Sequence, residues 1–366
     1  MVASPMSSPV TPALAIRDLV SWFETPWGTV RAVDHVSLSV APGRSLGIVG
    51  ESGSGKTQTF YSVLGLTRGA PGVIAGSARI ASVELLDGLD QYVERTVDAD
   101  GRAVVTKSPT WQPVHEARVK TVVGRDVAIL FQDPRRSLIP YWTIGRHLQE
   151  VLSRQPQERS VANGWREVAL ARLAELGFSQ TQRVLNSYPE QLSGGEAQRA
   201  MLAITMAMHP SVLIADEPTT GLDTINQSRA LESIAYQHQS LHMALILISH
   251  DLGVVDAMVE NVIVMYAGRV VASAPATILR ELPDDRLHPY ALELRVSRDR
   301  RSRNATLTAG EGGAPAPRAT TGCAFRHRCT LRPRLPESVR SRCDGEAPPL
   351  RALESSYTVA CWGIES

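Results

Sequence analysis

The chain has 366 residues, 43% of them hydrophobic, and a formal net charge of +1. This length suits one large α/β domain with a smaller appendage, and the balanced charge gives no field that would draw the whole surface toward nucleic acid. Residues 1–12 lack the basic and apolar regions of a signal peptide, and no apolar run approaches the roughly 20 residues that span a bilayer. We therefore expect a flexible tail on a protein that is soluble by itself.

Residues 13–40 alternate apolar and polar positions, which is typical of half-buried antiparallel strands. The apolar run 46–49 then leads into residues 50–57, GESGSGKT, which match the phosphate-binding pattern G-x-x-x-x-G-K-[ST] at every fixed position. A helix-like stretch, 58–66, follows. Strand, loop and helix in this order are the context that the motif requires, so the sequence predicts a nucleoside triphosphate site.

The chemistry of this loop follows from its residue types. Glycines let successive backbone N–H groups turn toward a phosphate, and the following helix adds the positive end of its dipole. Lys56 can reach the outer phosphates, and the Thr57 hydroxyl can ligate Mg²⁺. The predicted nucleotide-binding residues of the segment are Gly50, Ser52, Gly53, Ser54, Gly55, Lys56, Thr57 and Gln58.

The middle of the chain mixes irregular and periodic segments. Residues 83–123 are polar and irregular, and the Asp-Ala-Asp-Gly sequence at 98–101 is typical of a hairpin turn. Residues 126–131 resemble a buried strand, and residues 144–187 have the apolar spacing of helices. Two later apolar runs, 212–215 and 245–248, are typical of strands buried on both faces of a parallel sheet, which indicates an α/β fold.

Two acidic residues follow the first of these apolar runs. Open α/β sheets place ligands at the carboxyl ends of their strands, so Asp216 and Glu217 are expected beside the phosphate loop. We predict that Asp216 helps to hold Mg²⁺ and that Glu217 is the general base that polarises the attacking water.

A second phosphate receptor is predicted at residues 192–199, LSGGEAQR. Ser193, Gly194, Gly195 and Glu196 begin a helix, where exposed N–H groups and a hydroxyl can bind an anion. Two receptors far apart in one chain suggest a sandwich, in which this helix of one subunit covers the nucleotide held by the phosphate loop of another.

This octapeptide makes the chain resemble an ATP-binding cassette (ABC) ATPase. The resemblance covers residues 13–295 and implies a parallel-sheet core, an antiparallel β subdomain and a helical subdomain at about 138–190. It also implies ATP and Mg²⁺ as ligands. Three further residues match family elements in chain order: Gln132 in the glutamine loop, which joins Mg²⁺ to the helical subdomain, Asp223 in the D-loop, and the switch residue His250. Trp27, before the phosphate loop, matches the aromatic residue that stacks on adenine, and Phe23 is the alternative for that role.

Three features narrow the resemblance to the oligopeptide, dipeptide and nickel importers. These are the sequence AVDHVS at 32–37, FQDP at 131–134 followed by Ser-Leu, and His-Pro-Tyr at 288–290. Two features depart from that subfamily. The 83–123 segment is longer than usual and has no assigned role, and Ile139 replaces the usual Asn.

All four cysteines lie in the segment 322–366, which follows a linker predicted at 296–321. Clustered thiols without an export signal favour metal binding over disulfides. Their spacing, x5, x13 and x17, contains no close C-x₂₋₄-C pair, which disfavours an ordinary zinc ribbon. The tails of several peptide-importer ATPases are similar, and that resemblance implies a [4Fe–4S] cluster on Cys323, Cys329, Cys343 and Cys361. The long second gap leaves ligation by Cys343 open, and Zn²⁺ or free thiols are the alternatives.

The resemblance implies the ATPase subunit of a bacterial importer for peptides or a related small solute. It would act at the cytoplasmic face of the inner (plasma) membrane. The implied partners are a second, different cassette subunit forming a heterodimer, two transmembrane permeases and an extracytoplasmic solute-binding protein, with no nucleic acid. Import of nickel or another metal chelate is an alternative. A non-transport ATPase of repair or translation is a weaker one, because the chain carries neither a second cassette nor long coiled-coil insertions.

Overall fold

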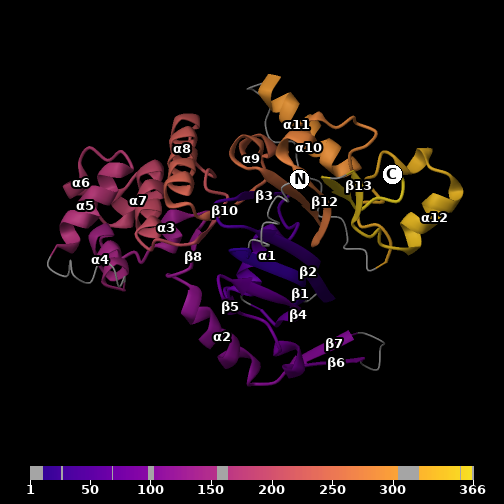
Figure 1. Cartoon of the computed structure of the whole chain (residues 1–366), viewed down its shortest axis with the longest axis horizontal. Coiled ribbons are helices and arrows are strands. Elements are labelled where there is room, and N and C mark those ends of the chain that lie inside the picture. The colour runs from indigo at the N-terminus through magenta and orange to yellow at the C-terminus, as the bar shows by residue number, and fades with distance from the viewer. Residues whose placement is uncertain are drawn as a thin grey trace, which may run out of the picture.

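A computed structural model describes residues 11–25, 28–67, 69–97, 103–154, 164–303, 321–354 and 356–364. Within them lie a four-stranded sheet, an eight-stranded sheet and a separate hairpin. Figure 1 shows the small sheet and its attachments below the large one, with helices α4 to α7 at one side and the C-terminal segment at the other.

The small sheet is antiparallel and has the strand order β2-β1-β4-β5. Buried and exposed residues alternate along the second half of β2, because one face packs on the core while the other meets water. The prediction of half-buried antiparallel strands at 13–40 is therefore confirmed. The strands are β1 (Leu14–Thr25), β2 (Gly28–Val40), β4 (Pro71–Ile80) and β5 (Val83–Glu84).

The large sheet has the order β13-β14-β12-β11-β3-β10-β9-β8, with parallel pairing from β11 through β8. Every residue of β3, β9 and β10 is buried, as the apolar runs predicted. These strands are β3 (Ser45–Val49), β8 (Val127–Leu130), β9 (Val212–Asp216), β10 (Ala244–Ser249), β11 (Asn261–Tyr266) and β12 (Arg269–Pro275).

Each face of the large sheet has its own core. Ile48, Ile214 and Ile246 point into a cluster shared with the small sheet and with α1 (Lys56–Val63). Leu213 and Leu245, one position away, join a second cluster on the opposite face. Successive side chains of a strand point to opposite faces, so strands covered on both sides need an unbroken apolar sequence. The helices of this second face include α8 (Thr224–Leu241), α9 (Leu252–Met258), α10 (Ala276–Glu281) and α11 (Pro289–Arg303).

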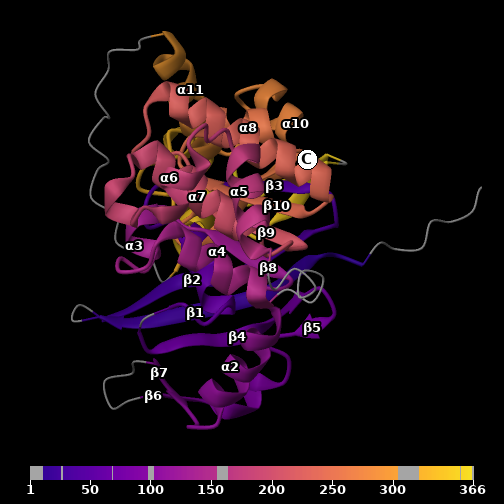
Figure 2. The same cartoon turned by 90° about the vertical axis from the view of Figure 1, so that its left-hand side faces the viewer.

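Residues 134–154 and 164–206 form a group of helices beside the sheet, at the left of Figure 1 and facing the viewer in Figure 2. Leu148, Leu173 and Leu185, from three of these helices, are buried together. The helices are α3 (Pro134–Ser137), α4 (Ile144–Arg154), α5 (Trp165–Glu175), α6 (Thr181–Asn186), η3 (Pro189–Gln191) and α7 (Gly194–Met206).

The 83–123 segment is more ordered than its sequence suggested. It contains η1 (Leu89–Tyr92), the hairpin β6 (Val93–Val97) and β7 (Ala103–Lys107), and α2 (Trp111–Val122). The expected turn at 98–101 lies outside the described residues, although the strands that flank it pair as a hairpin. The sequence did not predict α2, because most of its residues are polar and only Trp111, His115 and Val122 are buried.

The C-terminal segment extends the large sheet. Its β14 (Tyr357–Val359) pairs antiparallel with β12, placing Val359 opposite Ala272, and β13 (Arg351–Glu354) pairs with β14. Its helices are η4 (Arg332–Arg334) and α12 (Glu337–Gly345). Helix α11 runs to Arg303, past the expected domain end at 295, and residues 304–320 of the expected linker lie outside the described residues. None of the described helices is both long and apolar enough to cross a bilayer.

Candidate functional site

The phosphate loop joins β3 to α1 and curls around the ammonium group of Lys56. Lys56 Nζ donates to the carbonyl of Gly50 at 2.6 Å and to that of Glu51 at 3.0 Å. Burial lowers the pKa of Lys56, while the nearby carboxylates of Glu217 and Asp216 oppose that shift. Gly55 has φ 102°, and a Cβ there would lie 2.4 Å from the carbonyl oxygen of Ala32, so only glycine fits.

The loop fits a triphosphate in two further respects. Ser52 and Gly53 lie at its tip and are exposed to solvent, where a ligand can approach them. The Ser54 hydroxyl is buried and has no hydrogen-bond partner among the described residues, although buried polar groups are normally paired. The side chain of Gln58 instead points along α1, donating to Ser62 and Thr67, so only its backbone remains near the loop.

Asp216, at the end of β9, faces the start of α1. Thr57 Oγ1 donates to Asp216 Oδ1 at 2.8 Å, and the Tyr61 hydroxyl also bonds to this carboxylate. Burial raises the pKa of Asp216, whereas these hydrogen bonds oppose the rise. A hydroxyl and a carboxylate are oxygen ligands of the kind that Mg²⁺ takes, so the donor set at this point fits that ion. Tyr61 was not predicted, because it carries no motif signal.

The carboxylate of Glu217 is held by three residues. Its Oε2 accepts hydrogen bonds from Gln132 Nε2 at 3.1 Å and from Thr220 Oγ1 at 3.0 Å, and His250 Nδ1 lies 3.3 Å from Oε1. The structure therefore brings together Gln132, Glu217 and His250, the three residues that the sequence predicted as catalytic. Thr220 was missed. The hydrogen bond with His250 is the main cause that lowers the pKa of Glu217, so this carboxyl is ionised at neutral pH.

The backbone of Glu217 has φ 46°, in the left-handed region that non-glycine residues seldom adopt. Its N–H donates to the carbonyl of Ile248 on the neighbouring strand at 2.9 Å, which fixes the turn after β9. Such strain persists where the surroundings impose it, and it is concentrated at functional sites.

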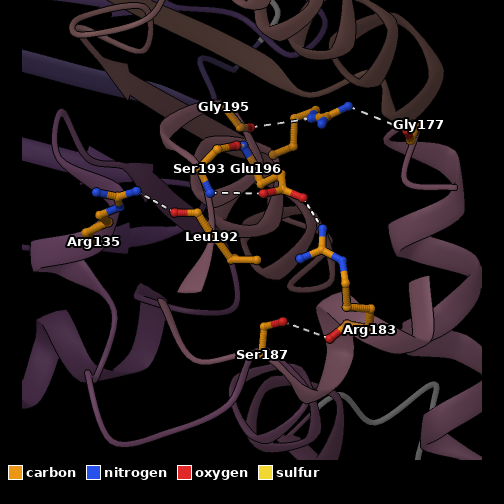
Figure 3. A network of polar contacts seen from close by, with 9 residues as sticks. Arg135, Gly177, Arg183, Ser187, Leu192, Ser193, Gly195 and Glu196 are labelled. Carbon is orange, nitrogen blue, oxygen red and sulfur yellow. Dashed lines mark hydrogen bonds and ion pairs between the residues drawn. The ribbon is translucent and has the colours of Figure 1, made fainter. Parts of the chain in front are cut away.

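Ser193 caps the N-terminus of α7 (Figure 3). Its hydroxyl accepts from the Glu196 N–H at 3.2 Å, while Glu196 Oε2 accepts from the Ser193 N–H at 2.9 Å, which is a capping box. Arg183 forms an ion pair with Glu196, and Arg135 donates to the carbonyl of Leu192. These arginines fix the loop before α7 from two sides.

The residues predicted in the glutamine loop, the serine-headed helix and the D-loop share one region. A pocket of about 540 Å³ is lined by residues that include Gln132, Gly194, Thr220 and Leu222. A Cβ at Gly195 would lie 2.9 Å from the end of the Asn226 side chain, so a larger residue there would displace Asn226 from its present position.

Asp223 has a local role at the start of α8. Its Oδ1 accepts from the Asn226 N–H at 3.1 Å, and its Oδ2 accepts from the Asn226 side-chain amide at 2.6 Å. These contacts cap the helix.

The predicted adenine-stacking residue, Trp27, lies outside the described residues. Its competitor Phe23 is in β1, opposite Pro71 of β4, and its ring contacts Gly69. These contacts give Phe23 a packing role within the small sheet.

The four cysteines are free thiols, and Cys343 and Cys361 are buried. Burial raises the pKa of Cys323 to about 11 and that of Cys361 to about 12, and neighbouring thiols contribute to both shifts. Each of the four interacts electrostatically with the others. Within the described part of the chain, however, no group of three or more His, Cys, Asp or Glu side chains is placed to hold a metal ion.

Comparison with known proteins decides the family. The family model described as ABC transporter matches residues 33–220, which contain the phosphate loop, Gln132, the α7 cap and Glu217. The chain belongs to the ABC transporter family.

Relatives align along nearly the whole length of this ABC ATPase. A protein named "Probable peptide ABC transporter ATP-binding protein" from Sinorhizobium fredii is 35% identical, over 95% of this chain and 94% of the relative. The oligopeptide transport ATP-binding protein OppD of Salmonella typhimurium is 32% identical, over 98% and 96%. Both alignments include the C-terminal segment, beyond the region of the family model.

Solved structures confirm the fold. A dimeric ATP-binding cassette in a post-hydrolysis state, bound to ADP and Pi, superposes with a TM-score of 0.56 at 20% identity, covering 72% of this chain and 98% of that one. The expected α/β cassette fold, with parallel and antiparallel sheets, is therefore confirmed for this ABC ATPase.

Proposed function

We propose that this ABC ATPase is the ATP-hydrolysing subunit of a bacterial importer of peptides or a related small solute. The observation that carries the proposal is the ionised Glu217 facing the phosphate loop, with Gln132 and His250 as its partners. The proposed class of transported solute comes from the relatives, because two of them are named for peptide or oligopeptide transport.

ATP would bind with its phosphates against the loop residues Gly50, Ser52, Gly53, Ser54, Gly55, Lys56 and Thr57. Lys56 is buried at the centre of the loop, where its charge can neutralise outer phosphate oxygens. Thr57, Asp216 and Gln132 would hold Mg²⁺, which when bound neutralises charge on the phosphates. Trp27 is our candidate for stacking on the adenine ring.

Glu217 would accept a proton from the attacking water as general base. The Thr220 hydroxyl and the Gln132 amide orient its carboxylate, and His250, which lies 3.3 Å from the same carboxylate, would contact the γ-phosphate. The left-handed backbone at Glu217 and these contacts hold its carboxylate in one orientation.

Closure of two cassettes would complete the site. Ser193, Gly194, Gly195 and Glu196 would contact the nucleotide bound by the partner, because the N-terminus of α7 presents backbone N–H groups. Asp223 would lie at the same interface. We propose a different cassette chain as the partner, giving a heterodimer.

Two permeases and an extracytoplasmic solute-binding protein would complete the transporter at the cytoplasmic face of the inner membrane. We propose that a permease docks near Gln132 and the helical group α4 to α7. Movement of these helices would then transmit the closure of the two cassettes around ATP to the permeases.

We propose a division of the chain into a tail (1–12), a cassette (13–295, with the helical subdomain at 138–190), a linker (296–321) and a cysteine-rich extension (322–366). Cys323, Cys329, Cys343 and Cys361 are proposed to bind a [4Fe–4S] cluster with a structural role. Four mutually interacting free thiols form a suitable donor set for it. Zn²⁺ is the alternative. Either group needs its ligands close around one point, and among the described residues no group of three or more His, Cys, Asp or Glu side chains is placed in that way.

Reconstitution tests the transport proposal. The chain would be assembled with its permeases, companion cassette and binding protein in vesicles, and uptake of labelled peptides would be measured with Mg·ATP. We expect peptide uptake that requires Glu217. Uptake of nickel chelates without peptides would replace the proposed substrate class, and ATP turnover without uptake of either would contradict an importer.

A further inference from the structure

Arg328, next to Cys329 in the C-terminal segment, reaches across to the phosphate loop. Its Nη1 donates to Glu51 Oε2 at 2.9 Å and its Nη2 donates to Glu51 Oε1 at 2.8 Å. Glu51 is the second residue of the GESGSGKT loop. The extension therefore makes a two-pronged, charge-assisted contact with the nucleotide site, a geometry that arginine offers and lysine does not.

The guanidinium is fixed by more than Glu51. Arg328 Nη2 also donates to Glu293 of α11 at 2.6 Å, and the group lies over the rings of Phe325 and Tyr266, 5.6 Å and 5.9 Å from their centroids. The exposed fractions of the Arg328 and Glu51 side chains are 33% and 43%. This pair is thus embedded in a network, unlike an isolated surface ion pair, which contributes little.

The backbone of Glu51 is held by the same region. Its N–H donates to the hydroxyl of Tyr290 at 2.6 Å. Tyr290 is fully buried, and its ring packs against Tyr266 and Phe325. The main chain of Glu51 is therefore fixed by α11, and its side chain by the C-terminal extension.

The charge of Glu51 matters at this position. Its carboxylate acts electrostatically on Lys56, so it also lies within range of phosphates bound at that lysine. A carboxylate without a counter-charge would repel a triphosphate, whereas the Arg328 contact neutralises it and holds it in one place.

We propose that Arg328 is a positioning residue for nucleotide binding: it anchors and neutralises Glu51, so the affinity for ATP depends on a contact supplied by the cysteine-bearing extension. This inference rests on ATP binding at the phosphate loop. It adds a role for the extension that is independent of any metal.

A double-mutant cycle tests the proposal. Binding of a fluorescent ATP analogue with Mg²⁺ would be measured on the full chain carrying Arg328→Gln, Glu51→Gln or both. We expect Arg328→Gln to weaken binding about three- to tenfold when Glu51 is present, and less than twofold when Glu51 is already Gln. Arg328→Lys should fall between wild type and Arg328→Gln, because it keeps the charge but loses the fork.

Arg340→Gln is the matched control. Arg340 pairs locally with Glu337 on α12 and does not contact the phosphate loop in the described structure. We therefore expect the affinity of the Arg340→Gln variant for the ATP analogue to stay within twofold of wild type. In the assembled ATPase, Arg328→Gln should raise KM for ATP and leave kcat nearly unchanged, whereas partial unfolding would lower kcat with KM unchanged.

An equal loss in both Glu51 backgrounds, or no loss in either, would overturn the role of Arg328. Lower kcat at constant KM would do the same. Failure of the wild-type chain itself to bind Mg·ATP would instead contradict the proposed function, so the two failures are distinguishable.

Discussion

At the residue scale, the conformation of Glu217 shows how the fold prepares a catalytic side chain. Its backbone has φ 46° and its N–H donates to the carbonyl of Ile248, while Gln132, Thr220 and His250 orient its carboxylate. The sequence predicted this residue from its place after an apolar strand. It could not predict Thr220 or Tyr61, since hydroxyl groups near an acidic pair occur in many loops.

We expect Glu217→Gln to retain ATP binding and to slow turnover by about two to four orders of magnitude, because the amide cannot accept the proton from water. Phosphate release and binding of a labelled nucleotide would be measured in parallel. Glu281→Gln on exposed α10 is the control, with turnover expected to match wild type. Normal turnover in Glu217→Gln would remove this residue from the role of base.

Tyr290→Phe removes the acceptor for the Glu51 N–H while preserving the buried ring. We expect a loss of about 1 kcal/mol in the free energy of unfolding, together with weaker ATP binding. Denaturant titration and equilibrium binding would measure the two effects. Tyr236→Phe, on an exposed tyrosine of α8, should change neither; equal behaviour of the two variants would show that the hydroxyl of Tyr290 does not hold the loop.

His288 gives the protein a predicted acid sensitivity. Complete burial lowers its pKa from 6.5 to about 3, so the folded state keeps this imidazole neutral while the unfolded chain takes up a proton. The contribution of neutral His288 to the free energy of unfolding is therefore complete at pH values well above 6.5. It is lost as the pH drops toward 3, by about 1.4 kcal/mol between pH 7.5 and 5.5.

Denaturant titrations at several pH values would measure this slope, with His288→Asn for comparison. Asn cannot titrate, so the difference in slope between the two proteins isolates the imidazole from other acidic transitions. Identical slopes would mean that His288 does not bind a proton differently in the folded and unfolded states.

At the scale of helices and strands, the sequence predicted an element correctly where its apolar residues followed one clear pattern. The unbroken apolar runs 212–215 and 245–248 became buried parallel strands because both faces of that sheet are covered. Helix α2 was not predicted, since its few buried residues give a weak apolar face. The pairing of β14 with β12 was also beyond sequence reasoning, because a three-residue strand carries almost no periodic signal.

The cap of α7 is expected to contribute separately to the stability of the chain and to ATP turnover. Ser193→Ala removes the capping hydroxyl, and we expect it to destabilise the chain by about 1 kcal/mol. It should also slow turnover in the two-cassette assembly more than that loss of stability explains, because Ser193 is proposed to contact the partner's nucleotide. Thermal unfolding and ATPase rates would be compared with Ser233→Ala, a change within α8. Wild-type turnover in Ser193→Ala would contradict the contact with the partner's nucleotide.

At the scale of the whole molecule, the complete site is proposed to require two cassettes. The loop, the carboxylates and the serine-headed helix of one chain supply complementary halves of such a site. The sequence predicted this from two phosphate receptors in one chain. It could not predict that the extension would become part of the large sheet and contact the loop, because Arg328 and Glu51 have no local pattern in common.

Glu217→Gln provides a way to trap the closed assembly. With Mg·ATP, we expect this variant to form a stable complex with its companion cassette, and to remain monomeric when the companion is absent. Light scattering coupled to gel filtration would give the masses. A homodimer formed by this chain alone would replace the proposed heterodimer.

The pairing of β12 with β14 has a consequence during biosynthesis. Thr358 and Ser273 are 85 positions apart, so a ribosome must translate that whole interval before the strand that covers β12 exists. Until then the nascent cassette exposes the backbone groups of an open sheet edge, which can pair with other chains. Prematurely stopped messages would therefore yield products prone to aggregate, even though the motifs for nucleotide chemistry had already been synthesised.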